Sequence, residues 1–240
     1  MTPLHFIAEH GNIDICDALL KHAKKLQEAG DNSIAIYNVK DGRGLTPVFR
    51  STSAHIAVQF LKAGFENLEL RGPQGETLLY HCTKQGALSA DLVHALTHQV
   101  NERVSFKHYK TQEMVVRPPV FAAPHERTVK AFLKSCKQHG IELDTVADDG
   151  YTLLHHCVEE NIASRYILRE LGELRGRVHR GKTPLQCARS DEVVEEILHN
   201  LDLELSEKLD LYRHCLENKL FSMKIGNLLC PLLPDINQGK

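Results

Sequence analysis

Tryptophan is absent from this 240-residue sequence, and aromatic residues make up only 6% of it. The shortage disfavours a β-sandwich, whose strands need large side chains, and suits a helical repeat built from Leu, Ala, Val and Ile. The sequence also has no excess of charge of one sign, because 29 Lys and Arg residues are balanced by 31 Asp and Glu residues, which gives a formal net charge of -2. Without a bulk positive field, nucleic acid is not expected as a partner.

Long apolar runs are missing as well. Runs such as residues 228–233 fall far short of the roughly 20 residues of a membrane span, so no span is expected. The N-terminus has neither the basic start nor the apolar core of a signal peptide. The seven cysteines include no CxxC pair, and their odd number favours reduced thiols over a disulfide framework. These features together predict a cytoplasmic protein.

What the sequence does contain is an internal repeat. Six segments align in one phase, beginning at residues 2 (TPLHFIAEHGN), 46 (TPVFRSTSAHI), 77 (TLLYHCTKQGA), 118 (PPVFAAPHERT), 152 (TLLHHCVEENI) and 183 (TPLQCARSDEV). Their starts are 44, 31, 41, 34 and 31 residues apart. Four of the segments follow a turn whose glycine stands two residues before the threonine, namely Gly44, Gly75, Gly150 and Gly181.

Simple physical chemistry accounts for this pattern. A threonine can cap the first N–H groups of a helix, and proline at the next position has the right φ and no N–H to leave unpaired. The preceding glycine allows the positive φ that a tight turn needs. Apolar residues then recur at helical spacing, so each unit is predicted to be two short helices that must stack on neighbouring units to bury their apolar faces.

The pattern resembles the ankyrin-repeat family over about residues 2–200, most closely in residues 2–20 and 140–155. The resemblance implies an all-α solenoid of about six irregular helix-turn-helix units over residues 1–200, with residues 201–240 forming a helical C-terminal cap or extension. We expect a cap helix at 202–221, because Leu205, Leu209, Tyr212, Leu216 and Leu220 form one helical face. The first repeat lacks a preceding turn, which suggests that the sequence is a fragment of a longer chain.

Some units depart from the family pattern. The second repeat has Arg50, Ser51 and Thr52 where apolar residues are usual. The fourth repeat has Pro118 as its cap and Pro124 inside its first helix, and Pro124 should shorten or kink that helix. Residues 21–36 predict a longer second helix and an extended turn, and residues 101–115 predict a long hairpin.

In the family, turn tips and exposed positions on the first helices bind a protein partner on the concave side. This resemblance implies a protein-binding module, not an enzyme, that is monomeric and uses no cofactor or metal. Tyr151 and Arg180 are the preferred anchors, since aromatic and Arg side chains often dominate interfaces. The predicted partner-binding residues are Arg43, Gln74, Glu76, Lys84, Asp148, Asp149, Tyr151, Glu159, His179, Arg180 and Lys182.

Two other functions stay open. The chain could be the targeting region of a larger enzyme, such as a bacterial effector delivered into a host cytosol. Alternatively, residues 176–183 satisfy the phosphate-loop pattern G-x-x-x-x-G-K-[ST] and could bind a nucleotide, although residues 164–174 before them predict a helix instead of the required strand. The pairs His81 with Cys82 and His156 with Cys157 resemble catalytic pairs, but they occupy matching repeat positions, which predicts core thiols.

Overall fold

The structure is a computed structural model that describes residues 1–30, 36–64, 69–107, 114–220 and 222–229. The chain divides into two compact units, residues 1–144 and 145–240. Unit 1 contains α1 (Pro3–His10), α2 (Ile13–Glu28), η2 (Pro47–Arg50), α3 (Ala54–Lys62), α4 (Leu78–Lys84), α5 (Ala90–Ala95), η3 (Thr97–Gln99), β1 (Val104–Lys107), β2 (Met114–Arg117), η4 (Pro119–Ala122) and α6 (Glu126–His139). Unit 2 contains α7 (Leu153–Glu159), α8 (Arg165–Leu171), η5 (Gly172–Gly176), η6 (Pro184–Cys187), α9 (Asp191–Asn200), α10 (Leu205–Asn218) and α11 (Met223–Leu229).

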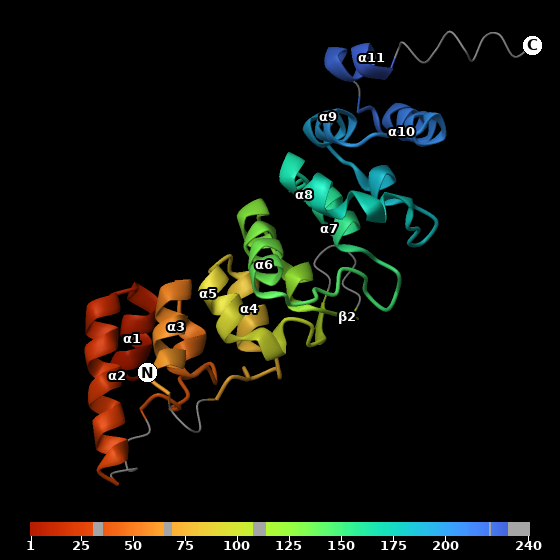
Figure 1. Ribbon diagram of the computed structural model, residues 1–240. Coiled ribbons are helices and arrows are strands. Elements are labelled where there is room, and N and C mark those ends of the chain that lie inside the picture. The colour runs from red at the N-terminus through yellow and green to blue at the C-terminus, as the bar shows by residue number, and fades with distance from the viewer. Residues whose placement is uncertain (31–35, 65–68, 108–113, 221, 230–240) are drawn as a thin grey trace, which may run out of the picture. The chain divides into compact units, whose positions relative to one another are not determined.

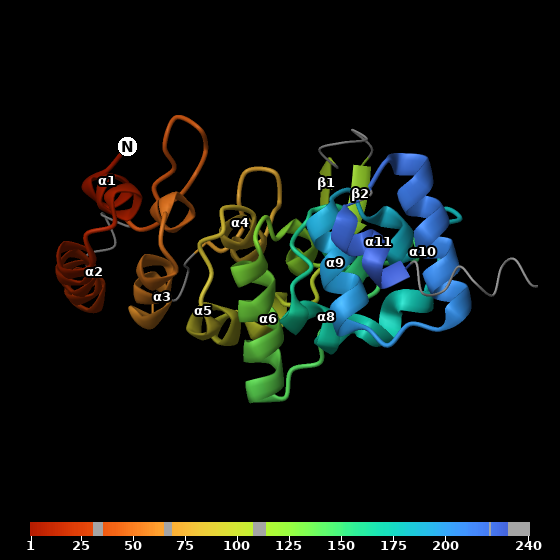
Figure 2. The ribbon, with the colours of Figure 1, turned by 90° about the horizontal axis from the view of Figure 1, so that it is seen from above.

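Helices begin at all six predicted repeat starts, and within each compact unit successive repeats stack on one another. In unit 1 the second helices α2, α3, α5 and α6 lie side by side in chain order (Figures 1 and 2). The first helices pack in the same way, α1 on η2 and α4 on η4. One apolar side chain is buried at the same position of all six repeats: Leu4, Val48, Leu79, Val120, Leu154 and Leu185. This recurring core explains why a single repeat could not fold alone.

The repeats alternate between a long and a short form, which the sequence did not lead us to expect. Repeats one, three and five begin with the α-helices α1, α4 and α7, whereas repeats two, four and six begin with the single 3₁₀ turns η2, η4 and η6. The residue after each 3₁₀ turn is extended, with ψ of 116° at Ser51, 118° at Ala123 and 136° at Ala188. The two short helices predicted for each repeat are therefore present, but in the even repeats the first of them is a single 3₁₀ turn.

The physical reason for the short form is an early start signal for the second helix. In the even repeats the N-cap of that helix comes soon after the repeat begins, at residues 53, 125 and 190 for starts at 46, 118 and 183. Ser190, for example, accepts a hydrogen bond from the Val193 N–H and so fixes the start of α9 at this position. The predicted shortening by Pro124 is confirmed, since η4 ends just before it.

Other predictions about insertions are confirmed within the described residues. The second helix α2 is long, with 16 residues, and Asn12 caps it by accepting the Ile15 N–H at 3.0 Å. The hairpin expected over 101–115 is formed by β1 and β2, which pair antiparallel from Val104 opposite Arg117 to Lys107 opposite Met114. Parts of both predictions, residues 31–35 and 108–113, lie outside the described residues.

The C-terminal helices continue the stack as a seventh helix pair. α10 packs on η6 and α11 packs on α9, as first and second helices do in the repeats before them. The His214 imidazole anchors α10, because its Nε2 lies 2.8 Å from the Ala188 carbonyl oxygen. The predicted cap helix is thus confirmed, but its predicted apolar face is not the one that packs. Leu211, His214 and Cys215 are buried, whereas Leu205 and Leu216 are exposed.

Candidate functional site

The turns between repeats form small, well-defined hairpins. The predicted glycines Gly44, Gly75, Gly150 and Gly181 have φ between 77° and 80°. In the turn before repeat five, the Ala147 N–H donates to the Tyr151 carbonyl at 2.8 Å and the Gly150 N–H donates to the Ala147 carbonyl at 2.9 Å. The turns at Asp41 and Gly72 repeat this pair of bonds. Their backbones are therefore fixed while the side chains at the tips stay outside.

In unit 2 two neighbouring tips are joined to each other. The His179 Nδ1 lies 2.9 Å from the Asp149 carbonyl oxygen and links the tip before repeat five to the tip before repeat six. The exposed residues of this pair of tips carry both signs of charge: Asp148, Asp149, Arg180 and Lys182. These four predicted binding residues, with half-buried His179, form one surface, which we call the paired tips.

Arg180 has an unusual backbone conformation within the paired tips. Its φ is 50°, and the following Gly181 has φ of 77°. Reciprocal backbone bonds between His179 and Lys182, of 2.9 and 3.0 Å, close the turn. Two successive positive φ values define a type I′ turn, which favours Asn-Gly or Gly-Gly. An arginine at the first position costs free energy, and such strain is commonly kept where the side chain serves a function.

Tyr151 does not lie at the surface as an interface anchor should. Only 4% of it is exposed, and its ring stacks on His155 with centroids 5.3 Å apart. Its hydroxyl donates to Glu159 Oε2 at 2.8 Å. Glu159 also pairs with Arg189, and its side chain is only 15% exposed. The prediction that Tyr151 contacts a partner directly is therefore wrong in this structure, because the residue supports the tips from below.

The imidazoles of His5 and His155 connect each of two long repeats to the following turn. The Thr152 N–H donates to His155 Nδ1 at 3.1 Å, so this nitrogen is an acceptor and the proton is on Nε2. His155 Nε2 in turn lies 3.2 Å from the Lys182 carbonyl oxygen. His5 repeats the arrangement with Thr2 and with Leu45, at 3.0 Å in both cases. Both histidines therefore have a structural role at the junction between a long repeat and the next turn.

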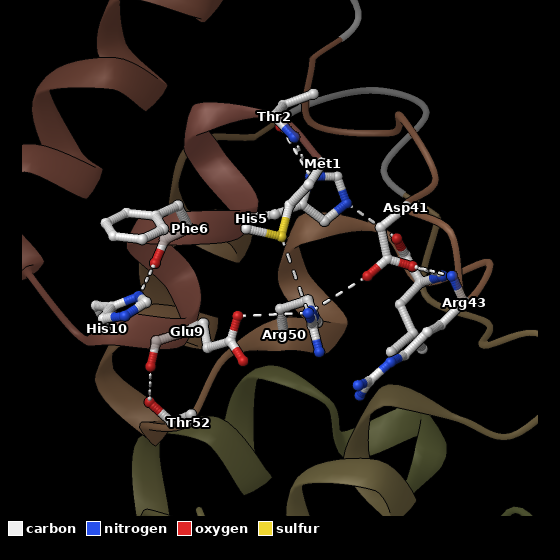
Figure 3. A network of polar contacts seen from close by, with 11 residues as sticks. Met1, Thr2, His5, Phe6, Glu9, His10, Asp41, Arg43, Arg50 and Thr52 are labelled. Carbon is white, nitrogen blue, oxygen red and sulfur yellow. Dashed lines mark hydrogen bonds and ion pairs between the residues drawn. The ribbon is translucent and has the colours of Figure 1, made fainter.

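A charged network occupies the matching region of unit 1 (Figure 3). Arg50 pairs with Asp41 at 3.2 Å and with Glu9 at 3.4 Å. Burial alone would raise the pKa of the Asp41 carboxyl, but the Leu45 and Arg43 backbone N–H groups and the Arg50 guanidinium outweigh it and hold the pKa below its usual value. Arg50, which seemed to break the repeat pattern, therefore ties repeat two to repeat one. Sequence reasoning missed this role.

The remaining predicted residues of unit 1 lie apart along its tips and helices. Arg43 and Gln74 are exposed at two turn tips, and their backbone N–H groups donate to Asp41 and Glu76. The half-buried Glu76 carboxylate therefore stabilises its own turn by accepting this hydrogen bond. Lys84 is exposed at the end of α4, where repeats one and five have Glu9 and Glu159. Unit 1 thus offers exposed side chains at its tips, and the segments that lead into its first two turns are joined by the Lys40–Glu69 ion pair at 3.0 Å.

The cysteines and histidines form no reactive centre in the described part of the chain. Cys82 and Cys157 are buried, and burial raises the pKa of the Cys82 thiol to about 12 and that of Cys157 further still. Burial also lowers the pKa of the His81 imidazole. The prediction of core thiols is confirmed. Among the residues described, no group of three or more metal-ligating side chains comes together.

The phosphate-loop pattern at residues 176–183 has the wrong surroundings. Gly176 ends the 3₁₀ helix η5, and Thr183 is the N-cap of the 3₁₀ helix η6. The segment before it is the helix α8, as predicted, instead of a strand. Lys182 and Gly181 belong to the type I′ turn of the paired tips, so the geometry of a nucleotide loop is not formed here. None of the helices in the described ranges is long and apolar enough to cross a bilayer.

Comparisons with known proteins gave one family match and several similar solved structures. Residues 1–29 match the family model described as ankyrin repeat. Similar solved structures include the ankyrin repeat domain of Bcl-3, at 18% identity and a TM-score of 0.46, covering 82% of this chain and 98% of that one. An ankyrin repeat domain from Acinetobacter baumannii has 16% identity and a TM-score of 0.44, covering 96% and 97%.

A third similar chain comes from the complex of a predatory endopeptidase from Bdellovibrio bacteriovorus with an immunity protein, at 20% identity and a TM-score of 0.49, covering 89% of this chain and 98% of that one. No curated protein matches the sequence. The family match and the recurring geometry point the same way. Residues 1–29 match the ankyrin-repeat model, and the helix pairs of the later repeats, in the residues that the structure describes, follow the same pattern.

Proposed function

We propose that the chain is a cytoplasmic binding module that holds a protein partner through its turn tips, with the paired tips of unit 2 as the main contact. The observation that carries this proposal is the hydrogen bond from His179 to the Asp149 carbonyl, which fixes two tips as one surface. A surface fixed before binding loses less conformational entropy when a partner docks.

The charges of the paired tips indicate what kind of partner would fit. Asp148 and Asp149 place two carboxylates on one tip, and Arg180 and Lys182 place two cations on the next. A complementary surface would carry a basic group and an acidic group at the same spacing, which favours specificity and fast association. The positive φ of Arg180 supports the same conclusion, because a strained backbone is commonly kept where the side chain serves a function.

The partner-binding residues proposed are therefore the exposed members of the predicted set, with Tyr151 and Glu159 in supporting roles. Tyr151 packs beneath the tips against His179, with ring centroids 5.2 Å apart, and so holds the imidazole that joins them. Arg43, Gln74, Glu76 and Lys84 of unit 1 are proposed as secondary contacts. Nothing in the arrangement requires a cofactor, and we propose no catalytic role.

A pull-down from cytosol with mass spectrometry tests the proposal. The wild-type chain is compared with Arg180→Ala/Lys182→Ala and with a control, Arg165→Ala/Arg169→Ala, which removes two exposed arginines from α8 of the same unit. We expect one protein to be retained by the wild type and the control and lost from the tip variant. Equal retention by all three chains would refute the paired tips as the site.

A further inference from the structure

A polar hollow of about 430 Å³ lies within unit 2, between the last turn and α10. One wall is formed by Gly181 and Lys182 of the turn and by Gln186 of η6, and the other wall by residues of α10 between Asp210 and Asn218. Its volume is within the range of about 300–1,000 Å³ that is usual for binding sites. Because Lys182 belongs to the paired tips, the hollow adjoins the surface proposed above for the partner.

The position of the hollow follows from the short connection before α10. α9 ends at Asn200 and α10 begins at Leu205, so the described residues 201–204 leave no room for a hairpin like the one at 147–151. His179 joins the last tip to the tip before it. On its other side the last tip has α10 as its neighbour, and the hollow separates the two.

The free side-chain groups on the turn wall are hydrogen-bond donors. Gln186 Oε1 accepts the Thr183 N–H at 2.9 Å, so the oxygen of this amide is used by the backbone and its NH₂ group is left over. Within the residues that the structure describes, neither this NH₂ group nor the Lys182 ammonium has a hydrogen-bond or ion-pair partner. This wall therefore offers one neutral and one charged donor.

The free side-chain groups on the α10 wall are acceptors. Asn218 Nδ2 donates to the His214 carbonyl oxygen at 2.8 Å, which leaves Asn218 Oδ1 unused. The Glu217 carboxylate is exposed, and neither it nor Asn218 Oδ1 has a partner among the described residues. Arg213 and Asp210 pair with each other at 3.1 Å. This wall therefore offers one neutral and one charged acceptor, opposite the two donors.

This arrangement favours an extended polypeptide over a simple anion or cation. The charged residues of the lining are two cations, Lys182 and Arg213, and two anions, Asp210 and Glu217, so the hollow as a whole attracts neither sign of charge. The carbonyl and the N–H of a trans peptide unit point to opposite sides of the chain. A peptide unit can therefore accept from one wall while it donates to the other.

We propose that the hollow holds an extended segment of the same protein partner that binds the paired tips. Gln186 and Asn218 bind a peptide unit of this segment through their side-chain amides. Lys182 contacts an acidic residue of the segment, and Glu217 contacts a basic one. The inference rests on the proposed function and deepens it, because it gives the chemistry of the partner segment and adds Gln186, Glu217 and Asn218 to the contact residues.

Site-specific photo-cross-linking of the full chain in a cytosolic extract tests whether the hollow and the paired tips share one partner. A benzoylphenylalanine replaces Glu217 in the hollow, Asp148 in the paired tips or, as a control, the exposed Glu173 of η5. We expect the probes at 217 and 148 to cross-link the same protein and the probe at 173 not to do so. The partner peptide joined to position 217 should contain both an acidic and a basic residue.

The outcomes separate this inference from the proposed function. A cross-link from 148 alone would leave the proposed function standing and refute the hollow as a contact. Cross-links from 148 and 217 to different proteins, or from 217 alone, would refute the shared partner. A cross-link from 217 to a second copy or to the same chain would overturn the inference by identifying another occupant. Silence at both positions would refute both proposals.

Affinities for the cross-linked partner then test the chemistry of each wall. Gln186→Glu keeps the oxygen that accepts the Thr183 N–H but replaces the NH₂ donor with an acceptor, and Glu217→Lys reverses the charge of the other wall. Each change should weaken the affinity by about tenfold or more, because like groups then face each other.

The matched control is Glu173→Lys, which makes the same charge reversal outside the hollow and should leave the affinity within about twofold. Helical content and melting temperature are recorded for all three variants, so that a loss of folding is not taken for a loss of contact. Unchanged affinity in folded Gln186→Glu and Glu217→Lys variants would refute the hollow as a contact.

Discussion

The strain at Arg180 leads to a prediction in which stability and binding change in opposite directions. Replacing Arg180 with asparagine keeps the type I′ turn and puts a residue that tolerates positive φ at its first position. The left-handed conformation costs an ordinary residue about 1–2 kcal/mol, and asparagine should recover part of this. We therefore expect Arg180→Asn to raise the free energy of unfolding by about 0.5–1 kcal/mol, while the partner is held less tightly.

The assay is thermal and urea unfolding followed by circular dichroism. A gain of this size corresponds to about 1–4 °C in melting temperature for a chain of this length. The matched control is Arg177→Asn, which removes the same side chain three residues earlier, where φ is -72°. We expect the control to change stability by less than about 0.5 kcal/mol. If Arg180→Asn is no more stable than Arg177→Asn, the argument from strain is refuted.

Three further predictions concern the scaffold. Gly75→Ala should destabilise the fold by about 1 kcal/mol because φ is 78° there, whereas Gly42→Ala should be neutral or slightly stabilising. Neither added methyl group would meet an atom within 4 Å, so the difference between the two variants reports the backbone angle alone. Equal unfolding midpoints would refute the turn geometry. The lowered pKa of Asp41 contributes stability above about pH 4, and this stability disappears as the pH falls through the folded-state pKa. The loss of stability that Asp41→Asn causes relative to the wild type should therefore be largest at neutral pH and vanish in acid. A loss of stability that does not depend on pH would contradict this. Cys82 and Cys157 should resist a thiol reagent at pH 8 until the chain is unfolded, and rapid labelling of the native protein would show that they are not buried.

The repeat pattern could be predicted because it rests on local chemistry. The four turn glycines with positive φ, Gly44, Gly75, Gly150 and Gly181, each stand two residues before a threonine, and glycine adopts that backbone at the lowest cost. The buried apolar residue two positions after the start is equally local, as at Leu4 and Leu154. These signals fixed the number and phase of the repeats. The positions of the tips then followed, and Asp148, Asp149, Arg180 and Lys182 are exposed as expected.

What could not be predicted depends on contacts between repeats. Tyr151 follows directly after a turn glycine, but whether its ring points outward or packs depends on His155 and Glu159, which lie in the next helix. Arg50 looked like a defect because its partners Asp41 and Glu9 come from the turn before and the repeat before. The alternation of repeat lengths did leave a signal, since each short repeat carries an early N-cap such as Ser53 or Ser190.

The central claim is that the paired tips of unit 2 hold a protein partner, and an affinity measurement tests it most directly. Once the pull-down has identified the partner, its dissociation constant is measured by isothermal titration with the wild type, with Arg180→Ala/Lys182→Ala and with Arg165→Ala/Arg169→Ala. We predict a loss of at least tenfold for the tip variant, or about 1.4 kcal/mol, and less than twofold for the control. Equal dissociation constants for the two variants would contradict the account.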